Sequence, residues 1–514
     1  MTCLLGIDSG LTVTKAVLFD ADGTALAVAR REVPQLMPEA RHVERDMDTL
    51  WRESAAAIRE VIERSGRSAG EIAAVATTAH GDGIYLLDRA RRPLGAGILS
   101  LDSRAGDVIR DWVGDGTSDR ALDLTGQSPH VAAQSALLAW IRRHQPERFA
   151  AIGTAFSCKD FLRFCLTGTI GTDRTEASSA FTDYRSQDYS DDALRLYGLE
   201  ALAHALPPAS HCAEIVGHVT AEAAVATGLV QGTPVAAGIH DVTASALGIG
   251  GHKQGTVGII AGTYSINEVV SDAPRIDARW FCRNAVAPGL WNSQAISPSS
   301  TTNYEWFLTT FCAAERARAE AEGSSIHAVL APEIEAAMAR PSTLLYQPFL
   351  FGSPYGEIAS ASFLGLHGWH TRGDVLAALL EGIVFNHRHH VDALREGFPV
   401  TTGHLTGGAS RNPTVAQLFA DVIGLPILVT ETDEAAAWGA ALCAGAAVGL
   451  YPAFDADPRD LAAITRTYLP DPARQAHYDA RYVVYREIAD GFAETWEKLD
   501  ALGRGTDGAG RTAR

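Results

Sequence analysis

Four acidic residues each follow a short apolar segment that is typical of a buried β-strand. They are Asp8 after residues 4–7, Asp82 after residues 72–76, Asp102 after residues 96–101, and Asp241 after residues 234–239. Side chains at strand ends are where α/β sheets present groups to ligands. One carboxylate can hold a hydrated Mg²⁺, and another can accept the proton of a hydroxyl group. The pattern therefore predicts a ligand site that is built from strand ends.

A simpler interpretation stays open for three residues near these strands. Asp82, Asp102 and Arg104 could form turns and a surface ion pair without binding any ligand, and the residues alone slightly favour that interpretation.

Asp241 begins a small-residue segment, residues 242–247, that is predicted to be helical. An aspartate there is well suited to cap the helix N-terminus, and the helix dipole favours its ionised form near neutral pH. Capping and catalysis are compatible, because the same geometry directs one carboxylate oxygen outward.

Two glycine-containing turns could hold phosphate oxygens through their main-chain N–H groups. The first, Ser9-Gly10-Leu11-Thr12, joins two strand-like runs within residues 4–23. The second, Gly262-Thr263, joins residues 256–260 to residues 266–270 in the same way. Either turn alone is an ordinary hairpin, which is a common feature. The repeat of one device in each half of the chain predicts an internal duplication, with a cleft between two related domains.

A third glycine-rich segment follows the predicted strand that ends at Thr406. Gly407 and Gly408 would let a flat ligand approach the main chain closely, and Asn412-Pro413 suits the start of a helix. Further helices are predicted at residues 47–63, 132–143, 158–166, 374–390, 415–423 and 476–502.

Composition excludes several classes of partner. The 514 residues carry a formal charge of −18 with only four lysines, which disfavours nucleic acid and anionic membranes as partners. The seven cysteines are widely spaced and lack a CxxC pair, so we expect buried reduced thiols and a cytoplasmic location. The uncharged run at residues 435–453 is rich in Ala and Gly, and a buried, closely packed helix suits it better than a membrane span.

Several familiar motifs are absent or unsuitable. No Gly-Lys dipeptide occurs, so there is no Walker A loop, and no His-Arg-Asp catalytic loop occurs. Residues 248–255 resemble a dinucleotide fingerprint only loosely, because the last glycine is misplaced. His387 and His390 could form a metal pair, but a half-exposed polar face of a helix is the expected interpretation.

Taken in order, these segments resemble the FGGY carbohydrate kinases over about residues 3–500. The motifs that carry the resemblance are GIDSGLTVTKAVLFD, AHGDGIYLLD with SLDSR, CKDFLRFCLTG with TDRTEASSAFTDY, GTPVAAGIHDVTASALGIG, IIAGTYS, ASFLGLHGWHTRGDVLAALLEGIVF, and LTGGASRNP with EAAAWGAAL. The resemblance implies an α/β fold of duplicated actin-like (ribonuclease H-like) domains with an interdomain cleft. It implies an N-terminal domain at residues 1–248 and a C-terminal domain at 249–502. Residues 503–514 are rich in Gly, Thr and Arg, a composition that predicts a disordered tail.

The same resemblance implies a role for each candidate residue. Asp241 would be the catalytic carboxylate, and Asp8 would organise Mg²⁺ through water. Substrate hydroxyls would be held by Asp82, Asp102, Arg104, His80 and His240. ATP would be bound by Gly10, Thr12, Lys15, Gly262, Thr263, Gly407, Gly408 and Asn412. The expected partners are ATP and a small sugar or polyol, and a homodimer is the assembly that the family suggests.

Two departures narrow the expected substrate. Leu11 stands where many members of the family have a threonine, so one phosphate contact is lost or moved. Gly81-Asp82 replaces the Met-His of the commonest xylulose kinases, which argues against that D-xylulose specificity. The motifs around Asp82 and residues 172–178 resemble erythritol kinases, whereas those at residues 296–307 and 370–385 resemble L-xylulose kinases. The expected reaction is phosphorylation of a primary hydroxyl of a ketose or polyol, L-xylulose or a related pentulose first. The alternatives are an erythritol or other C4/C5 polyol kinase, a non-catalytic nucleotide-binding module of the same fold, and an enzyme that hydrolyses ATP alone.

Overall fold

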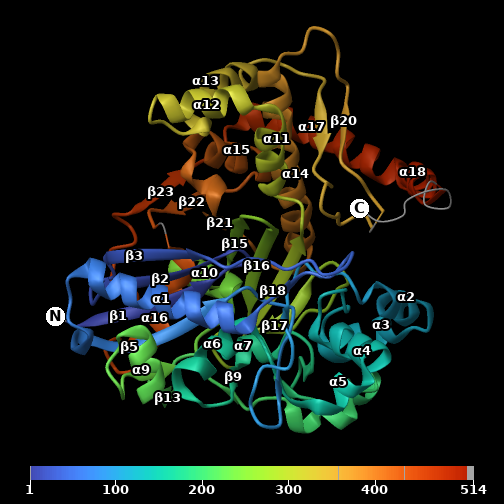
Figure 1. Ribbon diagram of the computed structural model, residues 1–514. Coiled ribbons are helices and arrows are strands. Elements are labelled where there is room, and N and C mark those ends of the chain that lie inside the picture. Colours follow the sequence, from blue (N-terminus) through green and yellow to red (C-terminus); the bar gives the residue numbers. More distant parts are fainter. Residues whose placement is uncertain (1, 357, 433, 506–514) are drawn as a thin grey trace. The chain divides into compact units, whose positions relative to one another are not determined.

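The computed structural model describes residues 2–356, 358–432 and 434–505 (Figure 1). The chain forms two compact units, and each is built from separate stretches of sequence. The first unit comprises Met1–Gln254, Val269–Gln294 and Thr430–Thr465, and the second comprises Gly255–Glu268, Ala295–Val429 and Arg466–Arg514. The predicted two-domain α/β architecture is confirmed.

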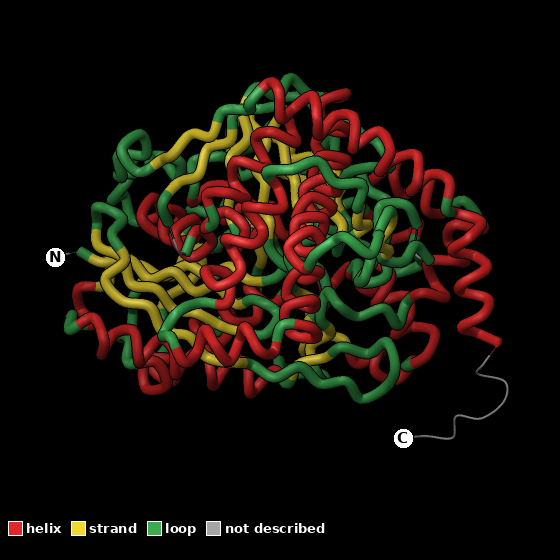
Figure 2. The backbone as a smooth tube through the Cα atoms, turned by 90° about the horizontal axis from the view of Figure 1, so that it is seen from above, coloured by secondary structure: helices red, strands yellow, loops and turns green. Residues whose placement is uncertain are grey.

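The first unit is organised by a six-stranded sheet of order β13-β14-β5-β1-β2-β3. Its central strand β1 (Cys3–Ser9) pairs antiparallel with β2 (Val13–Asp20) and parallel with β5 (Ile72–Ala79). The outer strands are β3 (Ala25–Glu32), β14 (Pro234–Ala236) and β13 (Ile215–His218). Figure 2 shows the strands near the N-terminus as one layer with helices beside it.

Both faces of this sheet are buried, which explains why β1 is apolar at almost every position. Cys3, Leu5 and Ile7 pack against α1 (Met47–Ser65) and α6 (Cys158–Thr167), whereas Leu4 packs on the opposite face. That opposite face is covered by α10 (Asp241–Gly248) and α16 (Ala435–Ala447). Because side chains alternate along a strand, one run of apolar residues serves both layers.

The remaining elements of the first unit are mostly short and form further small sheets and a helical subcluster. They are β4 (Glu44–Arg45), η1 (Ala69–Glu71), β6 (Tyr85–Asp88), β7 (Gly97–Ile98), α2 (Gly106–Gly114), α3 (Thr117–Thr125), α4 (Gln134–His144), α5 (Pro146–Ala151), β8 (Ile152–Phe156), β9 (Thr172–Asp173), α7 (Arg174–Ala177), β10 (Thr182–Asp183), β11 (Asp188–Tyr189), α8 (Asp191–Leu196), η2 (Glu200–Ala205), β12 (Ala209–Ser210) and α9 (Ala221–Thr227). Helices α2, α3 and α4 share a buried cluster with β6 and β8.

A seven-stranded sheet repeats the central arrangement of the first, in the order β17-β18-β16-β15-β21-β22-β23. Strand β15 (Thr256–Ala261) pairs antiparallel with β16 (Ser265–Ser271) and parallel with β21 (Thr402–Thr406). The hairpin β15–β16 with its parallel neighbour β21 thus matches β1–β2 with β5, which confirms the predicted duplication. The other strands are β17 (Phe281–Asn284), β18 (Trp291–Ser297), β22 (Ile427–Thr430) and β23 (Thr465–Tyr468).

Helices make up most of the rest of the second unit. They are α11 (Thr302–Phe311), α12 (Ala313–Ala321), α13 (Ile326–Met338), α14 (Arg372–Gly397), η3 (Gly408–Arg411), α15 (Pro413–Ile423), α17 (Pro472–Gly491) and α18 (Ala493–Gly505), and a small hairpin joins β19 (Leu345–Gln347) to β20 (Ser362–Leu364). The single helix predicted at residues 476–502 is wrong, since the segment divides into α17 and α18 at Phe492. Of the expected tail at 503–514, residues 503–505 belong to α18, and residues 506–514 lie outside the described residues.

Helix α16 is the buried, small-residue helix that the sequence predicts, and glycines set how closely it approaches its neighbours. A Cβ added at Gly439 would lie 2.1 Å from the main-chain oxygen of Ala244 in α10, and one at Gly248 would lie 2.0 Å from that of Ala435. A Cβ at Gly6 in β1 would lie 2.2 Å from the oxygen of Ala437. Among the described residues, no helix combines the length and apolar character that crossing a membrane requires. All seven cysteines are free thiols, and all except the half-buried Cys165 are buried, as expected.

The histidines of α14 differ from their predicted environment. His387 and His390 are buried rather than half-exposed, and His390 donates to or accepts from the Ser297 hydroxyl at 2.9 Å. His387 contacts the Asn267 side-chain oxygen at 3.0 Å and the Ser300 hydroxyl at 3.2 Å. Burial lowers the pKa of His387 to about 3, so the ring is neutral at physiological pH. One ring nitrogen then donates a hydrogen bond and the other accepts one. Within the described residues, no cluster of His, Cys, Asp and Glu side chains is suited to a metal ion.

Substituting Gly439 by alanine tests the contact between α16 and α10. The added methyl group requires a main-chain shift, so we expect the free energy of unfolding to fall by about 1–3 kcal/mol. Gly114→Ala at the end of α2 is the matched control, because a Cβ there meets nothing within 4 Å. Urea denaturation measures both variants. Equal stability of Gly439→Ala and the wild type would show that the two helices can separate freely.

Candidate active site

Asp8 lies at the carboxyl end of the central strand, as the sequence predicts. It stands opposite Lys15 in the β1–β2 hairpin, and the Lys15 ammonium group lies 3.5 Å from its carboxylate. The same ammonium group lies 3.2 Å from the carboxylate of Glu434. Burial raises the pKa of Asp8, with Lys15 opposing the shift and Glu434 adding to it. A nearby cation therefore stabilises the ionised form of the Asp8 carboxylate.

The turn after Asp8 is held from its carbonyl side by two side chains. Arg45 donates to the main-chain oxygen of Gly10 at 3.0 Å and also to that of Leu11. Gln35 donates to the Leu11 oxygen at 3.1 Å. Because the carbonyl groups are bound on one side, the Gly10–Thr12 turn is fixed in one conformation. The Leu11 side chain, at the position of the departure, packs against the core of the unit.

Arg45 is unusual because its guanidinium group is fully buried and is paired with main-chain oxygens. Its Nε and Nη1 atoms have no hydrogen-bond partner among the described residues. A buried cation that is only partly satisfied stabilises negative charge nearby. No local motif marks Arg45, because it lies in the two-residue strand β4, 35 residues from Gly10 in the sequence.

Asp241 is the first residue of α10, and the residue that occupies the capping position is His240. The prediction that Asp241 caps this helix is therefore wrong. Its carboxylate instead accepts from its neighbouring Val242 N–H at 2.7 Å and is also stabilised by the Gly81 N–H. Two amide donors and a 30% exposed side chain leave one part of the carboxylate accessible.

The environment of Asp241 also corrects the expectation that it is ionised at neutral pH. Burial, the charge of Asp8 and the charge of Asp82 together raise the pKa of Asp241 to about 7, and the two amide donors only partly oppose them. Desolvation and like charges thus outweigh the helix dipole. A carboxyl with this pKa is well matched to accept and release a proton near neutral pH.

His80 and His240 lie beside these carboxylates, and both are buried. His80 contacts the Tyr85 hydroxyl at 3.2 Å, so one of its nitrogens is occupied within the protein. The main-chain N–H of His240 donates to the Thr175 hydroxyl at 3.0 Å, while neither ring nitrogen has a hydrogen-bond partner in the described residues. Burial and the Arg283 charge lower the pKa of His240 to about 3. Of the two histidines, the neutral ring of His240 is the one that can still bind a hydroxyl group.

Asp82 is bound by a residue that sequence reasoning missed. Arg283 in β17 lies 3.1 Å from the Asp82 carboxylate, and His130 lies 3.5 Å from its other oxygen. Burial opposes ionisation of Asp82, but Arg283 and His130 outweigh it and hold the pKa of Asp82 well below its ordinary value. No local motif marks Arg283, because the two partners are 201 residues apart in the sequence.

Asp102 and Arg104 form a buried ion pair rather than the surface pair that was the alternative interpretation. The Arg104 guanidinium donates to both Asp102 oxygens at 2.7–3.0 Å and to Glu44 at 2.7 Å. Asp102 also accepts from the Val43 N–H at 2.7 Å. The two side chains therefore hold each other and the adjacent main chain, and both carboxylate oxygens of Asp102 are occupied.

In the second unit, Gly262 and Thr263 form the turn of the β15–β16 hairpin. The Gly262 oxygen accepts from the Thr301 N–H at 3.0 Å and from its hydroxyl at 2.7 Å, and the Thr302 hydroxyl donates to the Thr263 oxygen at 3.2 Å. Thr263 is exposed, and a Cβ added at Gly262 would meet nothing within 4 Å. As at Gly10, the carbonyl side of the turn is bound and a face is left open.

Behind this turn, helix α14 fixes the loop that binds it. Asn386 donates to the Ser297 hydroxyl at 2.9 Å and to the Ser299 oxygen at 3.0 Å, beside the contacts of His387 and His390 already described. The buried histidines thus support the segment 297–302 that holds Gly262 and Thr263.

The segment after β21 has the conformation that its glycines predict. Gly407 has a φ of 94°, and a Cβ there would lie 2.4 Å from the Ala261 oxygen, so only glycine fits. Gly408 is open on its Cβ side. The Asn412 side-chain oxygen accepts from the Thr414 N–H at 2.9 Å, which caps α15 and confirms the predicted helix start.

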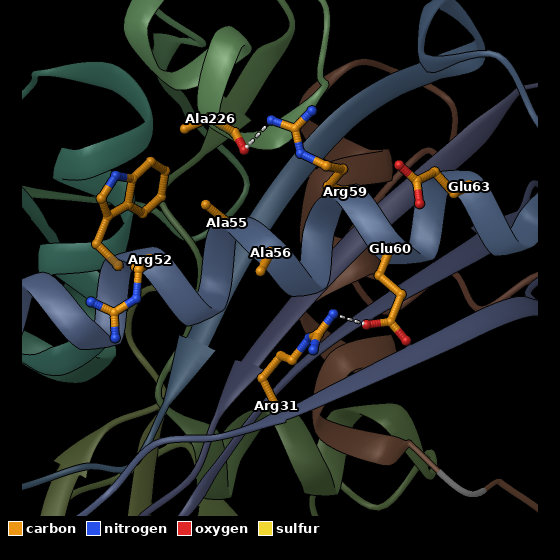
Figure 3. A pocket seen from close by; sticks show the side chains of 9 residues that line it. Arg31, Arg52, Ala55, Ala56, Arg59, Glu60, Glu63 and Ala226 are labelled. Atoms are coloured by element: carbon orange, nitrogen blue, oxygen red, sulfur yellow. Dashed lines mark hydrogen bonds and ion pairs between the residues drawn. The ribbon is translucent and has the colours of Figure 1, made fainter.

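A hollow of about 500 Å³ on the first unit contains none of the predicted site residues (Figure 3). Its lining includes Arg31, Arg59 and Glu60 together with small apolar side chains of α1. Arg31 pairs with Glu60, and Arg59 donates to the main-chain oxygens of Val225 and Ala226 at 2.5 and 2.7 Å. Its arginines are thus bound within the protein, and nothing in the lining resembles a catalytic group.

Comparison with known proteins shows which class this arrangement belongs to. The N-terminal domain profile of the FGGY family of carbohydrate kinases matches residues 3–248, and the C-terminal domain profile matches residues 257–448. The chain therefore belongs to the FGGY family of carbohydrate kinases, and it is an ATP-dependent sugar or polyol phosphotransferase.

Individual relatives cover nearly the whole chain. It is 34% identical over 488 residues to the L-xylulose/3-keto-L-gulonate kinase of Escherichia coli, with 94% of this chain and 96% of that protein covered. It is 29% identical over 518 residues to the erythritol kinase of Brucella abortus, with 96% and 97% covered. The crystal structure of xylulose kinase from Rhodospirillum rubrum superimposes with a TM-score of 0.82 at 28% identity, covering 96% of this chain and all of that one.

Replacing Asp241 by asparagine tests the electrostatic description. Because the folded-state pKa of Asp241 is about 7 and its unfolded value is about 4, ionisation costs stability as the pH rises between these values. Asp241→Asn removes that cost, so we expect the ligand-free variant to be more stable than wild type by about 1–3 kcal/mol at pH 8 and nearly equal at pH 4.

The contrasting variant is Asp82→Asn. Arg283 lowers the pKa of Asp82, so this substitution should reduce stability above pH 4 and not increase it. Urea denaturation at both pH values measures the two effects. If the Asp241→Asn variant is less stable than wild type at pH 8, the raised pKa of Asp241 is contradicted.

Proposed function

We propose that this kinase transfers the γ-phosphoryl group of ATP to a primary hydroxyl of a small ketose, with L-xylulose or a related pentulose as the first candidate. Erythritol or another C4/C5 polyol is the second candidate. The observation that carries the proposal is Asp241, a partly exposed carboxylate with a pKa of about 7 beside Asp8, Asp82 and the neutral ring of His240. The names of the two curated relatives support the choice of substrates.

In the proposed reaction, Asp241 orients the acceptor hydroxyl and takes its proton. Phosphoryl transfer has a loose transition state, so positioning and charge neutralisation matter more than a strong base. Asp82 and His240 offer hydrogen-bond partners for the other hydroxyl groups of the acceptor. His80, Asp102 and Arg104, which bind within the protein, would act mainly by fixing the walls of the site.

We further propose that Asp8 holds Mg²⁺ through water. The chemistry of its surroundings fits this ion, because Mg²⁺ commonly keeps several waters and takes one or two protein carboxylates together with phosphate oxygens. Asp8 is a half-buried carboxylate whose raised pKa a cation would lower again. When bound, Mg²⁺ would supply charge neutralisation for the phosphates.

The nucleotide residues are proposed for each unit separately. In the first unit, Gly10, Thr12 and Lys15 would line the phosphate site. The Gly10 N–H is used within the turn, where it donates to the Val13 oxygen at 2.9 Å, so Thr12 and the Lys15 ammonium group would supply the donors. In the second unit, Gly262 and Thr263 would bind phosphate, and Gly407, Gly408 and Asn412 would border the adenosine. Support comes from the geometry of these segments, since each leaves an open glycine or exposed turn while its carbonyl side is bound.

A cytoplasmic location and a homodimer complete the proposal. Seven free thiols support a reducing compartment. The homodimer follows only from the family, and light scattering of the purified protein measures it directly.

A coupled ATP assay over C4 to C6 ketoses and polyols tests the proposed reaction. We expect the highest kcat/KM for a C4 or C5 acceptor and a loss of at least about 10³-fold in Asp241→Ala, because the hydroxyl loses its proton acceptor. ATP hydrolysis without any acceptor would favour the hydrolase alternative, and nucleotide binding without turnover would favour the non-catalytic one. Equal turnover in Asp241→Ala would contradict the assigned role.

Replacing Arg45 by methionine tests the first phosphate turn. The Gly10 carbonyl loses its side-chain donor and the Leu11 carbonyl keeps only Gln35, so the turn is held less firmly and we expect KM for ATP to rise by about tenfold or more. KM for the acceptor should change much less.

Arg59→Met is the matched control, since Arg59 also donates to two main-chain oxygens of the first unit but lies in the hollow of Figure 3. It should leave both KM values unchanged. If Arg45→Met binds ATP as tightly as wild type, the Gly10 turn is not a phosphate contact or does not depend on Arg45.

A further inference from the structure

The Asp82–Arg283 pair is held far more firmly than an ordinary ion pair near a protein surface. The Arg283 side chain is 2% exposed, and the Asp82 side chain is 18% exposed. Besides Asp82, the guanidinium contacts the side-chain oxygen of Gln127 at 3.1 Å and that of Gln294 at 3.5 Å. It also lies over the ring of Phe281, 4.9 Å from the ring centroid. Arg283 is thus restrained on several sides and cannot turn toward a new partner without losing these contacts.

The supports of Arg283 are themselves fixed. Gln127 donates to the main-chain oxygen of Ser178 at 2.7 Å, and the N–H of Asn284 donates to the Ser178 hydroxyl at 3.0 Å. The neighbour of Arg283 in β17 and the partner of its guanidinium therefore share one anchor. This arrangement fixes both the position and the charge of the guanidinium group.

The backbone at Asp82 is held in an unfavourable conformation. Asp82 has a φ of 55°, in the left-handed region that non-glycine residues rarely adopt. Its neighbour Gly81 has no room for a side chain, because a Cβ there would lie 2.0 Å from the Nε2 atom of His240. The N–H of Gly81 also stabilises the Asp241 carboxylate. The turn that presents Asp82 is thus built against the same residues that would bind and activate the acceptor.

The charges around Asp82 decide which acceptor substrates can bind there. Arg283 is already neutralised by Asp82, and Asp82 keeps an exposed fraction through which it can accept a hydrogen bond from a hydroxyl group. Lys15, the cation beside Asp8, is likewise paired with carboxylates. An acceptor that carries its own carboxylate would meet the like charges of Asp82 and Asp241, while Arg283 and Lys15 are already paired with carboxylates.

We propose that the Asp82–Arg283 pair is a specificity device that selects uncharged ketoses and polyols over the corresponding sugar acids. The inference rests on the proposed function in placing the acceptor beside Asp241. It assigns Arg283 a positioning role, because the guanidinium acts on the acceptor through Asp82. It also distinguishes between the two substrates in the name of the Escherichia coli relative, of which 3-keto-L-gulonate is an acid and L-xylulose is not.

Matched neutral and acidic compounds test the proposal. Binding is measured by thermal shift and calorimetry with the pairs erythritol and erythronate, and xylitol and xylonate, which differ only in CH₂OH against COO⁻. Phosphorylation is measured with L-xylulose and 3-keto-L-gulonate. We expect wild type to prefer the neutral member of each pair by about tenfold or more in Kd or kcat/KM.

Asp82→Asn should reverse part of this preference. The substitution leaves Arg283 with a free positive charge, so binding of the acid should improve while binding of the neutral compound weakens, and the ratio should fall by about tenfold. High salt should reduce the gain for the acid, a response that loss of packing alone would not produce. Arg283→Gln should weaken the binding of both compounds, and the neutral compound should still bind more tightly than the acid.

Asp277→Asn is the control, because Asp277 forms an Arg279 ion pair at 2.8 Å on the same segment without contacting any proposed site residue. It should leave the ratio unchanged. Equal or tighter binding of the acids to wild type, or an unchanged ratio in Asp82→Asn, would overturn the inference. Selective binding without phosphorylation of any compound would instead contradict the proposed function and leave the specificity device supported.

Discussion

The first unit depends on holding three carboxylates close enough to act on one another without letting their repulsion open the fold. Asp8, Asp82 and Asp241 each come from the end of a different segment, and the charges of the first two raise the pKa of the third. Each is stabilised differently: Asp8 by Lys15, Asp82 by Arg283, and Asp241 by two main-chain N–H groups. Among the described residues no lysine or arginine pairs with Asp241, so it is the carboxyl that can take up a proton near neutral pH. The difference in partners, rather than in residue type, gives the three aspartates different chemistry.

Close approach of main chains is what brings these groups together. Gly6, Gly248 and Gly439 let α16 lie directly against β1 and α10, and α10 carries Asp241 at its first residue. Gly81 lets the segment before Asp82 touch His240. A side chain at any of these positions would force neighbouring segments apart, because the added Cβ would lie only 2.0–2.2 Å from a main-chain oxygen or a buried ring atom. The glycines of these Ala- and Gly-rich segments are therefore required for the close packing of the main chains.

Much of this could be predicted from the sequence, because it follows from local patterns. Apolar runs that end in Asp8 and Asp241, and glycine turns that repeat in both halves, predict the duplicated hairpins and the strand-end carboxylates. What the sequence could not give are relations between distant residues. Arg283 and Arg45 carry no motif, and each is recognised only when the fold brings it to Asp82 or to the Gly10 turn.

Protonation states cannot be predicted from local sequence either, because they too depend on residues that are distant in the sequence. From the sequence, Asp241 at a helix N-terminus is expected to stay ionised, whereas desolvation and two neighbouring carboxylates raise its pKa. His387 and His390 show the converse, since their polar side chains suggest an exposed helix face. In the fold they are neutral groups that bind Ser297, Ser300 and Asn267 inside the second unit. A side chain's charge is a property of its surroundings, and local sequence describes only the nearest of them.

The two duplicated hairpins show how far such surroundings can diverge while the main chain is kept. Both turns have their carbonyl groups bound from behind, but the donors are Arg45 and Gln35 in the first unit and Thr301 and Thr302 in the second. The first turn follows Asp8, whose charge is offset by Lys15, and the turn itself is held by the charged Arg45. The second follows Ala261, has no adjacent acid to offset, and is held by neutral hydroxyl and amide groups that rest on the buried histidines of α14. Equivalent turns in the two units are thus held by a cation in one and by hydroxyl and amide groups in the other.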